Sequence, residues 1–86
     1  MLSKRIRNEV KEMVDHEIQW GQSMAWPHTE KDYRLIGRGL RDRVNSKIAD
    51  RYASESLLGS LLMGLAMRLA WKLIQNWVDE KIKELT

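Results

Sequence analysis

The residue types that usually carry catalysis or bind metals are scarce in this chain. It has no cysteine and only two histidines, so thiolate chemistry is excluded and His16 and His28 are the only imidazole bases. Glu9 and Glu12 precede His16 by seven and four residues, so the three side chains can share one helical face. A metal site in a helix bundle needs such motifs from at least two helices, and no other predicted helix contains histidine. We therefore expect no enzyme activity, no bound metal and no cofactor.

A row of basic residues is the second feature of the sequence that could bind a ligand. Its members recur at spacings of three and four between residues 31 and 51, which places them along one side of a helix. Most are arginine, whose guanidinium makes bidentate contacts with phosphate or carboxylate. The candidates for an anionic partner are Lys31, Arg34, Arg38 and Arg41, together with Lys4, Arg5 and Arg7 near the N-terminus, and an adjacent row is formed by Arg43, Lys47 and Arg51.

Two interpretations of the basic row stay open. Asp42 and Asp50 interrupt it, so we favour a solvated face paired with acids on another helix or subunit. Nucleic-acid binding is the alternative, and it is helped by the N-terminal cations, which oppose the dipole of the helix that they begin. The net charge of +3 permits an anionic partner but is modest for a dedicated nucleic-acid-binding protein.

Apolar periodicity predicts an all-α fold of three helices, at about residues 3–20, 29–52 and 54–84, in one domain spanning residues 1–86. The first helix has apolar residues at spacings of three and four and is expected to end near Gly21. Thr29 is expected to cap the second helix. In that helix Gly37 and Gly39 predict a bend or a close helix crossing. A phosphate-binding loop is a poorer interpretation, because the strand that should precede it is missing.

The third predicted helix dominates the chain. Between residues 57 and 67 its apolar side chains surround the helix axis, so we expect the helix to be largely buried. Two shorter helices cannot easily cover it, which predicts self-association or binding to another protein. Small residues at every fourth position would let a second helix approach. The predicted oligomer interface consists of Ser56, Leu57, Ser60, Leu61, Gly64, Leu65 and Met67.

Four tryptophans and no phenylalanine are an unusual aromatic composition for 86 residues. Tryptophan is common both in small cores and at interface hot spots. We expect Trp20 and Trp77 to lie in the core. Trp26, in the predicted loop, and Trp71, away from the main core stripe, are the candidates for a partner surface.

Membrane insertion is not expected from the sequence. The longest uncharged stretch, residues 56–67, is shorter than the roughly 20 residues that a spanning helix needs, and Arg68 and Lys72 follow it. The basic N-terminus lacks the apolar run of a signal peptide, so we expect an intracellular location or a place within an assembly. The leading hypothesis is a small homo-oligomeric assembly protein. A nucleic-acid-binding module and a peripheral membrane protein are the alternatives.

Overall fold

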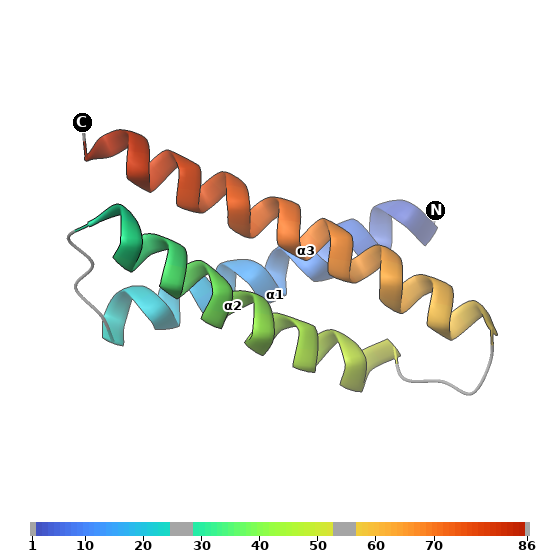
Figure 1. Ribbon diagram of the computed structural model, residues 1–86. Helices are drawn as coiled ribbons and strands as arrows, with labels where there is room; N and C mark the ends of the chain where they lie inside the picture. Colours follow the sequence, from blue (N-terminus) through green and yellow to red (C-terminus); the bar gives the residue numbers. More distant parts are fainter. Residues whose placement is uncertain (1, 25–28, 53–56, 86) are drawn as a thin grey trace.

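The computed structural model consists of three helices, α1 (Leu2–Met24), α2 (Glu30–Tyr52) and α3 (Leu57–Glu84), with successive helices running antiparallel (Figure 1). It describes residues 2–24, 29–52 and 57–85, and within these ranges there is no strand. The predicted all-α class, the number of helices and the long C-terminal helix are thus confirmed. Ser56 and Trp26 lie outside the described residues.

The first helix is longer than predicted, because it continues through Gly21 to Met24. Gly21 does not adopt the left-handed conformation of a helix-ending glycine, and no described glycine has a positive φ. A Cβ at Gly21 would lie 3.5 Å from Leu40 Cδ2 of α2. This is an ordinary van der Waals distance, so Gly21 lies beside α2 as an internal residue of α1 and does not end the helix.

The start of α2 is closed by reciprocal hydrogen bonds between Thr29 and Asp32. The Asp32 amide donates to Thr29 Oγ1 at 3.1 Å, and the Thr29 amide donates to Asp32 Oδ2 at the same distance. This arrangement is a capping box with aspartate as the acidic partner. The cap predicted at Thr29 is confirmed.

The core is a single apolar layer enclosed by the three helices. Its buried members are Ile6, Val10, Met13 and Val14 of α1, Leu40, Val44 and Ile48 of α2, and Ala66, Ala70, Ile74 and Val78 of α3. The closest helix contact lies at Gly37, where a Cβ would be 2.7 Å from Val78 Cγ2. The close crossing predicted from the glycines is therefore confirmed at Gly37 but not at Gly39, which has no neighbouring atom within 4 Å.

The prediction that α3 is largely buried is wrong. Its buried residues form one stripe of mostly small side chains, Gly59, Ala66, Ala70, Ile74 and Val78. Four leucines of its first half lie outside the bundle, since Leu57, Leu58, Leu61 and Leu65 are 78%, 60%, 64% and 44% exposed. Other large side chains there, such as Leu62 and Met63, are half-buried and pack against the core. The physical reason is geometric, because α1 and α2 together cover only one side of α3.

The two glycines of α2 provide a matched test of the helix crossing. We expect Gly37→Ala to lower the free energy of unfolding by about 1–2 kcal/mol, because Val78 must move and overpacking outweighs the gain in helix propensity. Gly39→Ala should instead raise it by about 0.5–1 kcal/mol, since its new methyl group meets no neighbour. Urea denaturation followed by circular dichroism measures both. Equal effects of the two substitutions would contradict the close contact.

Candidate functional site

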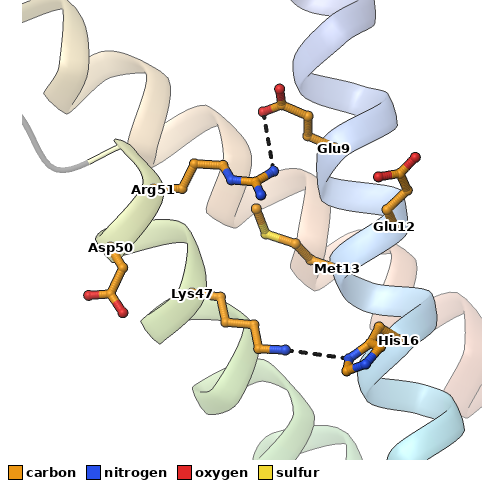
Figure 2. Close-up of a pocket in the computed structure, with 7 residues that line it drawn as sticks. All are labelled: Glu9, Glu12, Met13, His16, Lys47, Asp50 and Arg51. Atoms are coloured by element: carbon orange, nitrogen blue, oxygen red, sulfur yellow. Dashed lines mark hydrogen bonds and ion pairs between the residues drawn. The ribbon is translucent and has the colours of Figure 1, made fainter.

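The predicted carboxylate and histidine face of α1 lies in a groove between α1 and α2. The groove has a volume of about 490 Å³ and is lined by Glu9, Glu12, Met13, His16, Lys47, Asp50 and Arg51 (Figure 2). Lys47 Nζ lies 3.5 Å from His16 Nδ1, and Arg51 Nη1 lies 3.8 Å from Glu9 Oε2. Within the described ranges, no three histidine or acidic residues are grouped so that they could hold a metal ion.

Glu17 is the buried charge beside this groove, and the sequence analysis missed it. Its side chain is 1% exposed, and Arg43 Nε donates to Oε2 at 2.6 Å while Lys47 forms an ion pair with Oε1. Burial alone would raise the pKa of Glu17, but the hydrogen bonds and charges of Lys47 and Arg43 outweigh it, so the pKa is lowered. The signal was present, because Glu17 continues the apolar spacing of Val10 and Val14.

A second polar contact joins the start of α1 to the end of α2. The Tyr52 hydroxyl donates a hydrogen bond to Glu9 Oε2, and Arg5 Nε donates to Glu9 Oε1 at 3.4 Å. The Tyr52 hydrogen bond holds the pKa of Glu9 below its usual value. Burial, followed by the nearby Glu9 carboxylate, raises the pKa of Tyr52 to about 12.

The adjacent basic row thus has a structural role. Arg43, Lys47 and Arg51 all pair with acids of α1, which confirms the interpretation of that row as a face paired with another helix. The groove of Figure 2 is therefore mainly the outer surface of a salt-bridge layer that holds α1 against α2.

A second cleft lies between α2 and α3. It has a volume of about 240 Å³ and is lined by Arg34, Gly37, Arg38 and Arg41 of α2 and by Trp71, Gln75 and Val78 of α3. The Arg41 guanidinium carbon lies 4.9 Å from the centre of the Trp71 ring. The structure thus brings three of the predicted anion-contacting residues together with one of the predicted partner-surface aromatics. We call these lining residues the arginine cleft.

The remaining basic candidates lie outside this cleft. Lys31 lines an adjoining groove with Glu30 and Leu35, and this groove shares Arg34 and Arg38 with the cleft. Lys4, Arg5 and Arg7 belong to the first turns of α1, and these turns lie at the end of the molecule opposite to the start of α2 (Figure 1). The seven predicted residues therefore do not form one surface.

Most of the predicted oligomer interface is exposed on α3. Leu57, Ser60, Leu61, Gly64 and Leu65 all lie on the outer side of the helix. A Cβ at Gly64 would have no atom within 4 Å. Met67 differs from them, because it is partly buried and packs against the core. We call Leu57, Leu58, Ser60, Leu61, Gly64 and Leu65 the leucine face.

The tryptophans are distributed between core and surface differently from the prediction. Trp20 is 42% exposed rather than part of the core, and the Arg43 guanidinium carbon lies 3.8 Å from its ring centre. It thus covers the salt bridge between Arg43 and Glu17. Trp77 packs against the core as expected and makes an edge-on contact with Tyr33, with ring centres 5.9 Å apart. Trp71 is half-buried against the core and contributes one edge to the arginine cleft.

By length and composition, α3 qualifies as a helix that could cross a membrane, although such a span was not expected from the sequence. Only 22% of its most apolar stretch of 18 residues is buried in the bundle. A core helix of a soluble protein passes the same test but is mostly buried.

No family model, curated protein or solved structure matches the chain. The surfaces themselves must therefore support any functional proposal.

The lowered pKa values of Glu9 and Glu17 predict how stability depends on pH. Because both lie below the ordinary value of 4.5, the two carboxylates contribute full stability above about pH 4.5 and lose it as the pH falls through their folded-state pKa values. Glu17→Gln should lower the free energy of unfolding at pH 7 by about 1–3 kcal/mol and make its decline toward pH 3 shallower. Urea denaturation between pH 3 and 7 measures both effects.

Glu12 provides the control for this measurement. It is exposed and has no ion pair with any other residue in the described ranges. Glu12→Gln should therefore leave the stability at pH 7 and its decline with acid close to those of the wild type. If Glu17→Gln behaves in the same way, Glu17 does not hold α1 and α2 together.

Proposed function

We propose that this protein is a small non-enzymatic assembly module that joins to a second copy of itself through the leucine face of α3. One observation carries the proposal: Leu57, Leu58, Leu61 and Leu65 expose between 44% and 78% of their surface next to one another on the same helix. Single exposed leucines are ordinary on a protein surface, but a contiguous group marks an interaction site.

The energetics of this face suit a partner of the same kind. Burying a leucine side chain completely contributes about 1.5–3 kcal/mol, and two copies would each contribute the same set. Partial burial in the single chain reduces this gain, yet the total is comparable with the estimated cost of association, about 4–15 kcal/mol. Residues 57–67 contain no charged residue, so pairing the faces desolvates no charge there.

The shape of the face also suits a helix. Ser60 and Gly64 are one turn apart, and the space beside Gly64 is open. Small residues at this spacing let two helices approach closely, while flanking leucines pack into the spaces between side chains. A symmetric pair of α3 helices would place the same face on both sides of the contact.

Replacing a leucine of this face should break the assembly without unfolding the chain. Leu61 is outside the core, so Leu61→Lys should leave the helical circular dichroism spectrum unchanged while shifting the mass measured by light scattering toward that of a monomer. Asn76→Lys is the matched control, because it adds the same charge at an exposed position of α3 and should leave the mass unchanged. A wild-type monomer at 100 µM would overturn the proposal.

The position of the contact is tested by Gly64→Leu. Inside the single chain the new side chain has free space, so the free energy of unfolding of the isolated chain should not fall. At a helix contact the same bulk should weaken association by about 1–3 kcal/mol. Sedimentation equilibrium measures the dissociation constant. An unchanged constant would place the contact elsewhere than at Gly64.

A membrane surface is the second candidate partner of the leucine face. It is supported by the apolarity of α3 and by Arg68 and Lys72, which follow the leucines in sequence and carry charges complementary to anionic lipid headgroups. Flotation with vesicles containing anionic lipid distinguishes the two. Capture of the wild type but not of Leu61→Lys, together with a monomeric mass in the absence of lipid, would favour the membrane over self-assembly.

A further inference from the structure

We infer that the arginine cleft between α2 and α3 is a binding site for the phosphate groups of a nucleic-acid strand. This inference is independent of self-assembly, because the cleft and the leucine face occupy different parts of α3. The cleft lies at residues 71–78, whereas the leucine face ends at Leu65.

The cleft presents three guanidinium groups from one side. Arg34, Arg38 and Arg41 are spaced by four and three residues, so they follow one another along the same face of α2. Gly37 lines the cleft between them, and its backbone packs against Val78 of α3. On the opposite side, Gln75 of α3 carries an amide that can donate hydrogen bonds, and Trp71 provides an aromatic wall.

The cations of the cleft are available to a ligand. Arg38 is exposed and makes no ion pair with any side chain in the described part of the chain. Arg34 Nη2 lies 2.8 Å from Glu30 Oε1, and Arg41 Nε lies 3.5 Å from Asp42 Oδ1. Both acids are exposed, and such surface pairs contribute about 0–1 kcal/mol. A phosphate that binds arginine in a bidentate manner can therefore compete with them.

The lining of the cleft favours an anion further. Among its described lining residues there is no acidic side chain, and the Arg41 guanidinium is already oriented by the Trp71 ring. An arginine held by an aromatic ring loses less conformational freedom when it binds. The cleft is thus better prepared for an anion than a set of mobile surface lysines would be.

The distribution of charge outside the cleft favours a strand over a single small anion. Lys31 precedes Arg34 by one turn on α2, and Arg68 and Lys72 flank Trp71 on α3. From Lys31 to Arg41 the helix rises about 15 Å, whereas a nucleic-acid strand carries one charge per about 3.4 Å of helix axis. The row thus matches several successive phosphates. Because it offers contacts to the backbone, we expect little sequence preference.

The test compares two exposed cations, one in the cleft and one on α1. A fluorescently labelled 20-mer of thymidine should bind the wild-type chain at 50 mM salt, with an affinity that falls as the salt concentration rises. Arg38→Gln should weaken binding about tenfold, and Arg38→Lys should restore part of it, because the ammonium retains the charge but not the bidentate contact. Lys11→Gln removes the same charge from an exposed position on α1 and should change the affinity less than about twofold. Fluorescence anisotropy measures the dissociation constants.

Three outcomes would overturn the inference. The first is no binding of either a DNA or an RNA 20-mer at 50 mM salt. The second is equal weakening by Arg38→Gln and Lys11→Gln, because the interaction would then depend only on net charge. The third is loss of binding to phosphatidylserine vesicles in Arg38→Gln with unchanged oligonucleotide binding, which would assign the cleft to lipid headgroups. Because Arg38 is exposed, its substitution should not unfold the chain. An unchanged circular dichroism spectrum of each variant checks this.

Discussion

The close approach of α2 and α3 is the constraint on which the rest of this structure depends. Gly37 brings the α2 backbone against Val78, and the buried stripe of α3 continues with Ala66 and Ala70. Small residues let the helix axes come close, which packs the thin core of a short chain densely. The same choice leaves the leucines on the opposite side of α3, among them Leu61 and Leu65, outside the bundle. The exposed leucine face is therefore a consequence of how the core is built.

The contact between α1 and α2 is built on a different principle. There the apolar residues are supplemented by the buried Glu17, which Arg43 and Lys47 neutralise, and by Glu9 with Tyr52. A buried ion pair adds little net stability compared with an apolar pair of similar volume, but an unpaired charge in the same place costs several kcal/mol. These contacts consequently penalise any other alignment of the two helices. They also occupy cations that would otherwise form a longer basic surface.

The helices and their order could be predicted from the sequence because they depend on local patterns. Apolar spacing located all three, and the Thr29 cap marked the start of α2. The end of α1 could not be predicted in the same way, since a glycine can either end a helix or lie inside it, and Gly21 lies inside α1. The prediction that α3 is largely buried failed for a related reason. Periodicity shows which sides of a helix are apolar, but not how many neighbours are present to cover them.

The candidate sites show the same division between local and long-range information. The spacing of Arg34, Arg38 and Arg41 on α2 was visible in the sequence, and Trp71 was already a candidate for a partner surface. That they line one cleft follows only from the antiparallel packing of α2 on α3. Glu17 could have been recognised as an acid within the apolar stripe of α1. Its partners Arg43 and Lys47 lie on α2, and the sequence did not specify which acids would pair with them.

Gly37 connects the core to the surface chemistry of the arginine cleft. The absence of a side chain at this position brings α2 within contact distance of Val78, and both residues line the cleft beside Arg34 and Arg41. A larger residue would collide with Val78 and push the two walls of the cleft apart. The separation of the two helices thus determines both how well the core is packed and how closely the guanidinium groups can surround an anion. In this small bundle, stability and the geometry of the cleft depend on the same helix crossing.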